Sequence, residues 1–280
     1  MMLEPLPVQS MLKDYGLKPQ KGLGQNFLVD DTYLQKIVRA ADVSRADVIL
    51  EVGAGLGSLT RYLASAAGEV ISVEIDRKLY AALKKVVKPY KNVCLVQGDI
   101  MEILPGDLVA KEGYKVVANI PYYLTSNLIR RLLEATVRPS LVVLTVQKEV
   151  AQRICAVPGN FSLLALGVQI YGKPSIAFQI PKGAFFPVPK VDSATLLVDL
   201  YPEPLIPIDR LGPFFLLAKT AFNQKRKMLH NSLTGAPALG HEQSLELLNK
   251  AGIPPDRRAQ TLSIAEWIAM TEQYATMLRI

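Results

Sequence analysis

The sequence predicts an α/β protein with a parallel, doubly wound sheet, followed by a small helical domain. Three observations support this prediction. Short apolar segments alternate with helical segments over the first half of the chain, which is typical of a parallel sheet. A glycine loop, residues 53–57 (GAGLG), separates an early strand from the helix after it. Beyond about residue 206 the apolar spacing is helical throughout.

Composition limits the class of protein. The chain has 280 residues, half of them hydrophobic, and 32 basic against 25 acidic residues give a net charge of +7. Such a chain forms one large domain, or a large and a small one, with a core that needs no disulfide or metal. Cys94 and Cys155 lack a Cys-x-x-Cys spacing, so we expect buried free thiols in a reducing compartment. Two histidines cannot form a His-based metal site, and we expect no metal.

The sequence contains no predicted membrane segment. No apolar run approaches the roughly 20 residues that span a bilayer. Residues 1–10 include Glu4, Pro5 and Pro7 and lack the basic and apolar regions of a secretory signal. We therefore expect a cytoplasmic protein without a membrane partner. The moderate positive charge is compatible with a polyanionic partner.

The elements of the sheet are predicted in chain order. A helix begins at a cap formed by Asp30 or Asp31 and runs to about Ala41. Short apolar, largely β-branched runs predict strands at residues 48–52, 70–73, 93–96, 115–118 and 141–146. Helices are expected from residue 58, over 77–87 and near 126–134.

The second half of the chain has a different pattern. Residues 176–180 and 194–200 read as strands, and because no helix fits between them, we expect them to pair antiparallel at the sheet edge. A proline-rich linker, residues 201–207, predicts domains 1–205 and 206–280, with a leader over 1–20. In the second domain we expect helices at 213–233 and 242–250, and a third after a capping box that starts at Ser263.

A candidate site follows the strand at residues 115–118. Open α/β sheets bind ligands at the carboxyl ends of their strands, and this strand ends at Asn119-Ile120-Pro121-Tyr122. Pro121 cannot donate to the ladder. Asn119 offers an acceptor and a donor, and Tyr122 offers a flat face on which a base can stack. Together they suit adenine, although the same residues also fit a turn after a core strand.

The glycine loop predicts a nucleotide-like cofactor. A strand, a glycine loop and a helix N-terminus form the usual cradle for such a group. Ser58 occupies the position where a dinucleotide fingerprint requires Gly or Ala, and no P-loop lysine follows. Glu74, at the end of the next strand, is placed to accept ribose hydroxyls, and Asp99 ends the third strand. A cofactor with adenosine but no pyrophosphate fits this pattern, and S-adenosylmethionine is such a cofactor.

These motifs resemble those of the S-adenosylmethionine-dependent adenine amino-methyltransferases. The resemblance rests on residues 51–57 (EVGAGLG) with Glu74, Asp99 and residues 119–122 (NIPY). Three further segments restrict the resemblance to one family of these enzymes. They are residues 24–28 (GQNFL), 185–193 (FFPVPKVDS) and 222–227 (FNQKRK). With them the chain is similar to the ribosomal-RNA adenine dimethyltransferases whose bacterial members confer kasugamycin sensitivity. The resemblance runs from about Lys21 to the C-terminus.

The resemblance implies both a fold and an activity. The fold is a Rossmann-like class I methyltransferase sheet with a small all-helical C-terminal domain that binds rRNA. The activity is dimethylation of the exocyclic amines of two adjacent adenines in the 3′-terminal hairpin of small-subunit (16S) rRNA, with S-adenosylhomocysteine as product. A pre-ribosomal 30S particle is the expected substrate, small-subunit biogenesis the expected role, and a monomer the expected state. Large-subunit rRNA or DNA adenine methylation shares these motifs. A ribosome-assembly factor with incidental catalysis is a third alternative.

The expected site residues form three groups. The cofactor is expected to contact Gln25, Asn26, Leu28, Gly53, Gly55, Glu74, Ile75, Asp99, Ile100 and Asn119. The catalytic residues are expected to be Asn119, Ile120, Pro121, Tyr122 and Phe185. RNA phosphates are expected to contact Lys190, Lys225, Arg226, Lys227, Arg257 and Arg258. Residues 185–187 also fit a plug of the core, and the basic residues also fit a solvated helix face.

Overall fold

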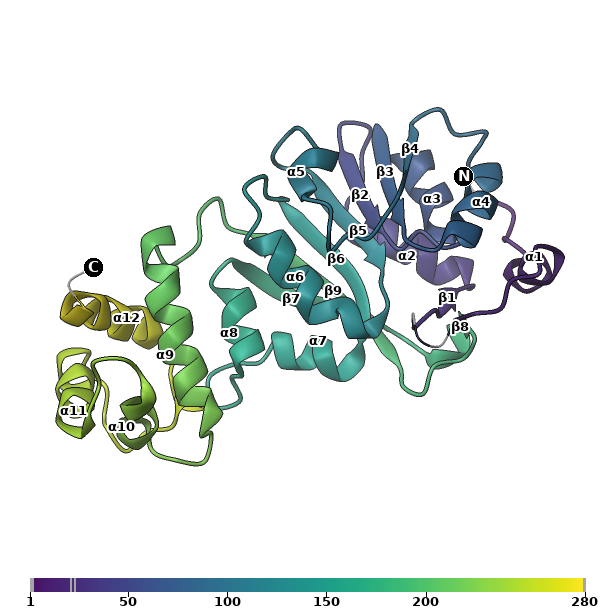
Figure 1. Ribbon diagram of the computed structural model, residues 1–280. Coiled ribbons are helices and arrows are strands. Elements are labelled where there is room, and N and C mark those ends of the chain that lie inside the picture. The colour runs from purple at the N-terminus through teal and green to yellow at the C-terminus, as the bar shows by residue number, and fades with distance from the viewer. Residues whose placement is uncertain (1–2, 21, 23, 279–280) are drawn as a thin grey trace. The chain divides into compact units, whose positions relative to one another are not determined.

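The computed structural model describes residues 3–20, 22 and 24–278. It contains two compact units, which are residues 1–151 with 174–200, and residues 152–173 with 201–280. The first unit contains the sheets, and helices form the second (Figure 1). No helix among the described residues is long and apolar enough to cross a membrane.

The main sheet has the strand order β4-β3-β2-β5-β6-β9-β7. Its strands are β2 (Val48–Val52), β3 (Glu69–Glu74), β4 (Val93–Gln97), β5 (Lys115–Asn119), β6 (Leu141–Gln147), β7 (Gly172–Ile180) and β9 (Ser193–Leu200). Strands β2 to β6 are parallel, and β9 pairs antiparallel with β6. The predicted parallel, doubly wound sheet is confirmed, as is the pairing of β7 with β9. The order reverses between β2 and β5, and such a switch point is where open sheets bind ligands.

Helices accompany the sheet in the first unit. They are α1 (Val8–Asp14), α2 (Asp31–Ala40), α3 (Ser58–Ala66), α4 (Arg77–Val86), α5 (Pro105–Leu108), α6 (Thr125–Leu133) and α7 (Lys148–Ile154), which continues into the second unit. Successive strand residues point to opposite faces, and Ile49 and Leu50 of β2 are both fully buried. Ile49 packs with Leu34 of α2 and Leu63 of α3. Both faces of the central strands are therefore covered, as parallel sheets require.

A second, two-stranded sheet lies outside the main one. Strand β1 (Phe27–Leu28) pairs antiparallel with β8 (Phe185–Phe186), with Phe27 opposite Phe186 and Leu28 opposite Phe185. The sequence analysis did not predict β1, because two residues show no alternation. The pairing brings residues near the N-terminus against a segment from much later in the first unit.

The second unit is helical, with an aromatic core. Its helices are α8 (Leu163–Gln169), α9 (Leu211–Asn223), α10 (Leu229–Ser232), α11 (His241–Lys250) and α12 (Ile264–Leu278). The ring of Trp267 stacks on Phe222 at a centroid distance of 5.9 Å. Ser263 and Glu266 form the expected capping box, in which the Ser263 amide donates to the Glu266 carboxylate at 2.7 Å.

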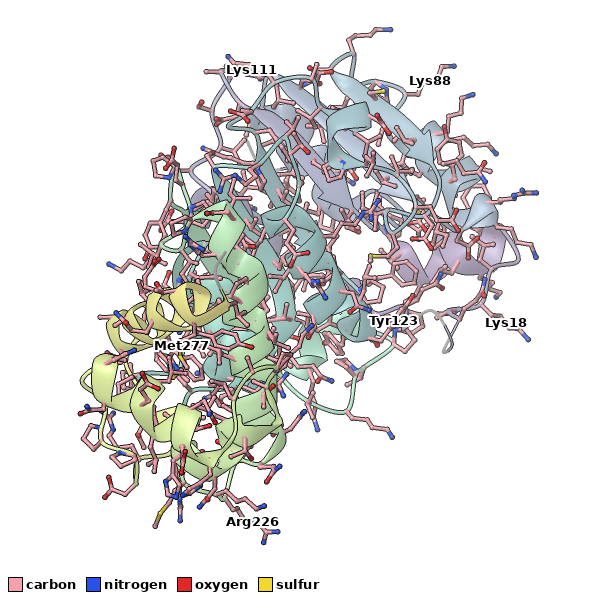
Figure 2. The ribbon with its side chains drawn as sticks, turned by 60° about the vertical axis from the view of Figure 1, so that its left-hand side comes forward. Lys18, Lys88, Lys111, Tyr123, Arg226 and Met277 are labelled. Atoms are coloured by element: carbon pink, nitrogen blue, oxygen red, sulfur yellow. The ribbon has the colours of Figure 1, made fainter. Side chains whose placement is uncertain are left out.

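Three expectations are wrong or shifted. The single helix expected over residues 213–233 is broken, because Gln224 leaves helical geometry (φ −125°, ψ 54°) and the Leu229 amide donates to the Arg257 carbonyl at 2.7 Å instead. Residues 152–173 group with the second unit rather than with 1–205, and within it the Leu205 amide donates to the Ile170 carbonyl. Cys94 is exposed rather than buried because β4 is the edge strand. The side chain of Arg226 projects outward after α9 (Figure 2).

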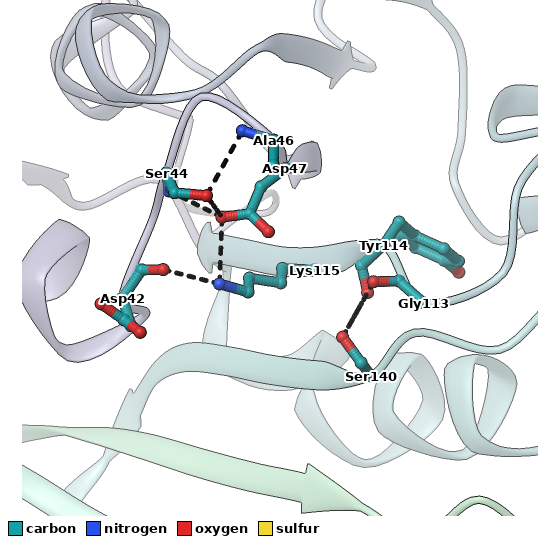
Figure 3. Close-up of polar contacts among 8 residues, drawn as sticks. All are labelled: Asp42, Ser44, Ala46, Asp47, Gly113, Tyr114, Lys115 and Ser140. Atoms are coloured by element: carbon teal, nitrogen blue, oxygen red, sulfur yellow. Dashed lines mark hydrogen bonds and ion pairs between the residues drawn. The ribbon is translucent and has the colours of Figure 1, made fainter.

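The amino end of β5 is fixed by a polar anchor (Figure 3). Lys115 Nζ donates to the Asp42 carbonyl at 2.6 Å and to Asp47 Oδ2 at 3.1 Å. Burial alone raises the pKa of Asp47, but hydrogen bonds from Ser44 and the Lys115 ammonium outweigh it and hold that pKa below its ordinary value. The anchor sets where β5 begins and therefore where its carboxyl end, Asn119, is placed.

Candidate active site

The glycine loop takes a backbone shape that side chains disfavour. Gly53, Gly55 and Gly57 have φ angles of +73°, +60° and +88°. A Cβ on Gly55 would lie 3.1 Å from the Phe27 ring, and one on Gly57 would lie 2.9 Å from Leu83. The loop is thus both left-handed and tightly covered, and it leads directly into the first turn of α3.

Glu74 holds the loop against the end of β3. Its Oε2 accepts the Gly55 amide at 2.7 Å, and its Oε1 accepts the Asp76 amide at 2.9 Å. Burial raises the pKa of Glu74, and these two backbone hydrogen bonds oppose the rise. A carboxylate has about four acceptor positions, so Glu74 retains the capacity to accept hydroxyl groups from a ligand.

Glu51 is a site residue to which the sequence analysis assigned no role. Its carboxyl is 1% exposed, and its Oε2 accepts hydrogen bonds from Thr60 and Ser72, both at 2.7 Å. Burial raises the pKa of Glu51 to about 7. An acid inside the otherwise apolar strand Val48–Val52 was the available signal, because carboxyls are almost never fully buried without a reason.

A cavity of about 280 Å³ joins the glycine loop to the end of β5. All ten predicted cofactor residues line it, namely Gln25, Asn26, Leu28, Gly53, Gly55, Glu74, Ile75, Asp99, Ile100 and Asn119. Ile75 is 46% exposed although it is apolar. An exposed isoleucine on a cavity wall offers a surface against which a flat apolar ring can pack.

The N-terminal segment closes one side of this cavity. Asn119 Nδ2 donates to the Asn26 carbonyl at 3.2 Å, and Asn26 Nδ2 donates to the Gly24 carbonyl at 3.2 Å. Gln25 Nε2 donates to Asp76 Oδ2 at 3.2 Å. Residues 24–28 are therefore tied both to the end of β5 and to the start of α4.

The predicted catalytic residues divide into two sets. Asn119, Ile120 and Pro121 line the cavity, whereas Tyr122 and Phe185 do not. The Tyr122 hydroxyl forms a 2.7 Å hydrogen bond with Ser193, and burial raises the pKa of this tyrosine. The adjacent Tyr123, which was not predicted, is 61% exposed and lines the cavity. A second aromatic after Asn-Ile-Pro-Tyr was the signal for it.

Phe185 is buried behind the cavity wall. It is 2% exposed and packs in a cluster with Leu28 and Leu34. Its register partner Leu28 lines the cavity, so the Phe185 ring lies one residue away from that space. The stacking role expected for Phe185 stays a prediction.

The predicted RNA contacts are mostly free to meet a phosphate. Lys190, Lys225, Arg226, Lys227 and Arg258 are exposed. Arg257 differs, because its guanidinium donates to Thr261 and forms an ion pair with Glu266. Each of the three guanidinium nitrogens thus has an internal partner, and the phosphate contact expected of Arg257 stays a prediction.

The fold and this cavity define a class of protein. A glycine loop after β2, acids at the ends of β3 and β4, and an amide at the end of the neighbouring β5 surround one space. That arrangement is the Rossmann-like sheet and site of a class I methyltransferase.

Comparison with known proteins identifies the family within this class. A model of the ribosomal RNA adenine dimethylase family matches residues 16–276. A protein of Dehalococcoides mccartyi named ribosomal RNA small subunit methyltransferase A is 44% identical over 260 residues, covering 92% of this chain and 89% of the relative. A protein of the same name from Pelotomaculum thermopropionicum is 38% identical over 283 residues, covering 96% of each chain. The chain therefore belongs to the ribosomal RNA adenine dimethylase family, whose members are S-adenosylmethionine-dependent methyltransferases.

Two solved structures share the architecture. The 23S rRNA methyltransferase ErmE is 26% identical, with a TM-score of 0.70, over 89% of this chain and 99% of that one. A dimethyladenosine transferase from Plasmodium falciparum is 24% identical, with a TM-score of 0.77, over 89% of this chain and 97% of that one. The second likeness supports the fold alone.

Proposed function

We propose that this protein transfers methyl groups from S-adenosylmethionine to the exocyclic amines of two adjacent adenines in the 3′-terminal hairpin of small-subunit rRNA, giving dimethyladenine at each. One observation carries the chemistry: the Asn119 amide, the glycine loop and Glu74 line a single cavity. The ten cofactor residues that line it belong to different elements, and a fortuitous turn after a core strand would not gather them.

The residues of the cavity fit the cofactor. Ile75 and Ile100 provide apolar surface for a flat base, and Asp99 ends β4 beside them as an acceptor for its amine. Glu74 is the acceptor for ribose hydroxyls, and the bare backbone of Gly53 allows close approach. When bound, S-adenosylmethionine supplies a methyl group on a sulfonium, which is an excellent leaving group.

The chain contributes hydrogen-bond acceptors rather than a strong base. The lone pair of the adenine amine is delocalised into the ring, so it must be drawn out of conjugation and aimed. Because Asn119 Nδ2 donates to the Asn26 carbonyl, the Asn119 Oδ1 is left as the acceptor for one amine hydrogen. The Ile120 carbonyl accepts the other. This is catalysis by positioning and electrostatics.

The second methyl transfer places a condition on these contacts. A monomethylated amine has only one hydrogen left, so Asn119 and Ile120 cannot both be engaged in that step. The second transfer therefore requires only one of the two acceptors. Aromatic faces then stabilise the base, which must leave its stack to enter, and Tyr122 and Phe185 are our candidates for this role.

Similarity to named relatives and exposed positive charge both support small-subunit rRNA as the substrate. The relatives with 37–44% identity are named small-subunit methyltransferases, whereas the large-subunit enzyme ErmE is 26% identical. The basic residues of the predicted set supply contacts to phosphates, and all of them except Arg257 are exposed. We propose that the substrate is a pre-ribosomal small-subunit particle in the cytoplasm and that the enzyme acts as a monomer.

Labelled cofactor tests this function. The protein is incubated with methyl-labelled S-adenosylmethionine and with small-subunit or large-subunit particles that lack adenine methylation, and the label is mapped in the rRNA. We expect dimethyladenine at two adjacent positions of the small-subunit 3′ hairpin, and transfer by Asn119→Ala that is slower by an order of magnitude or more. Label in large-subunit rRNA would assign the alternative activity, and binding without any label would indicate an assembly factor.

A further inference from the structure

Much of the positive charge of the chain is concentrated on one segment of the first unit. Residues 77–98 contain no Asp or Glu. Their basic residues are Arg77, Lys78, Lys84, Lys85, Lys88 and Lys91. These six charges compare with a net charge of +7 for all 280 residues. None of the six belongs to the basic residues considered above, which lie mainly in the other unit.

The structure places the first four of these side chains on the open side of α4, and Lys88 and Lys91 follow in the connection between α4 and β4. The helix buries Leu79, Ala82 and Leu83, and all six basic residues are exposed. On a helix with 3.6 residues per turn, Arg77 and Lys84 lie on one line, and Lys78 and Lys85 lie on the line beside it. Within the described part of the chain, none of these side chains forms an ion pair with a carboxylate.

The N-terminal leader extends this surface. Val8 and Leu12 of α1 pack in one cluster with Leu79 and Ala82 of α4. Lys85 Nζ lies 4.9 Å from the centroid of the Tyr15 ring. Lys18 is exposed beyond α1, and Figure 2 shows both Lys18 and Lys88 projecting from the first unit. The leader thereby acquires a role that the sequence did not assign.

The surface begins at the rim of the active-site cavity. Ile75 and Leu79, at the start of α4, line that cavity, so Arg77 and Lys78 lie next to its wall. Both features belong to the first unit. A polyanion that delivers an adenine to the cavity can therefore continue along α4.

We propose that the α4 surface (Lys18, Arg77, Lys78, Lys84, Lys85, Lys88 and Lys91) binds backbone phosphates of the small-subunit rRNA outside the target hairpin. The proposal rests on the proposed function, which makes rRNA the substrate. The exposed basic side chains of residues 77–98 have no Asp or Glu among them, which matches the regular negative charge of an RNA backbone. An anionic membrane fits less well, because none of the large hydrophobic residues of α4 is exposed for insertion.

A charge-neutralised variant with a matched control tests this surface. Lys84→Gln, Lys85→Gln and Lys88→Gln are combined in one protein, and Lys36→Gln, Arg39→Gln and Lys111→Gln in the control. Both remove three exposed charges from the first unit. Binding to unmethylated small-subunit particles and to a short RNA with only the target hairpin is measured from about 50 to 200 mM salt.

We expect the α4 variant to bind particles at least about 10-fold more weakly and to lower the slope of log K against log salt by about 2 to 3, since each lost phosphate contact lowers it by roughly 0.9. Binding to the short hairpin and cofactor affinity should stay within about two-fold of wild type, and the control should behave as wild type on both RNAs.

Several outcomes would overturn the assignment. An equal loss of particle binding in the variant and the control would mean that binding depends only on the net charge of the protein. An equal loss of affinity for the particle and for the hairpin would mean that these residues contact the target hairpin itself. Unchanged particle binding would mean that the exposed face of α4 contacts only solvent. Binding of vesicles containing phosphatidylserine that depends on these lysines, without an effect on particles, would assign a membrane instead. Failure of the wild type to methylate particles at all would instead count against the proposed function.

Discussion

Asn119 shows how one side chain depends on several distant parts of the chain. Its backbone ends β5, which the Lys115 anchor positions, and its Nδ2 is held by the Asn26 carbonyl from the N-terminal segment. A side-chain amide has both a donor and an acceptor, so fixing the donor determines where the acceptor points. The sequence predicted the residue and its chemistry, but not the partner that orients it.

Removal of this amide should slow chemistry more than binding. We expect Asn119→Ala and Tyr122→Ala each to lower the single-turnover rate by an order of magnitude or more, while cofactor still binds by calorimetry. In the proposed mechanism both residues act on the base, and nine other predicted cofactor residues still line the cavity. A wild-type single-turnover rate in either variant would contradict the proposed mechanism.

Glu51 gives the fold a predictable dependence on pH. A carboxyl whose pKa rises from 4.5 to about 7 on folding stabilises the folded state fully below pH 4.5, and this contribution is lost as the pH rises through 7. We expect Glu51→Gln to have nearly wild-type stability at pH 4.5 and to become more stable than wild type by a few kcal/mol at pH 8. Denaturant unfolding of both proteins across this range measures the difference. A constant difference would mean that folding does not raise the pKa of Glu51.

At the scale of elements, the spacing of apolar residues predicted most strands and helices of the first unit correctly. The strands β2 to β6 and the helices α2, α4 and α6 fall close to their predicted bounds, and all of them except the edge strand β4 bury apolar side chains. Elements whose stability comes from distant partners were missed. Strand β1 has two residues and exists only because β8 pairs with it, and the break after α9 depends on the Arg257 carbonyl.

Phe185 of β8 has two possible roles, which are packing in the core and stacking on the target base. Phe185→Leu keeps most of the apolar volume and should cost less than about 1.5 kcal/mol of stability, but it removes a flat face. We expect turnover on rRNA to fall about 10-fold if the ring encloses the base as proposed. Phe185→Ala serves as the comparison, with a stability loss of about 3 kcal/mol or more. Full turnover by the leucine variant would leave Phe185 a core residue only.

At the scale of the whole molecule, the sequence separated the cofactor-binding part from the helical part but placed the division differently. The linker at residues 201–207 marked one crossing between the units. The other two crossings, at residues 151–152 and 173–174, lie inside α7 and β7, where the sequence pattern is that of a continuous helix and a continuous strand. Glu74, Asp99 and Asn119 were predicted because they follow successive strands, whereas residues 25–28 came from the family resemblance. Tyr123 and Glu51 were not predicted, because their roles depend on which face each side chain occupies.

The basic residues after α9 should affect RNA without affecting the cofactor. Lys225→Gln, Arg226→Gln and Lys227→Gln together are expected to weaken binding to small-subunit particles and to reduce its salt dependence by up to about three phosphate contacts. Cofactor affinity should not change, since none of the three lines the cavity. Arg257→Gln, by contrast, should lower thermal stability because its internal partners Thr261 and Glu266 lose their donor. An unchanged salt slope in the triple variant would exclude these phosphate contacts.

The pairing of β1 with β8 has a consequence for the nascent chain. Phe27 finds its partner only when Phe186 has been translated, so residues 24–28 have no strand to pair with while the intervening polypeptide is being made. Until then the pocket for the methyl donor lacks one wall. The enzyme thus becomes able to retain its donor late in its own synthesis, and fragments released before residue 185 should be unable to do so.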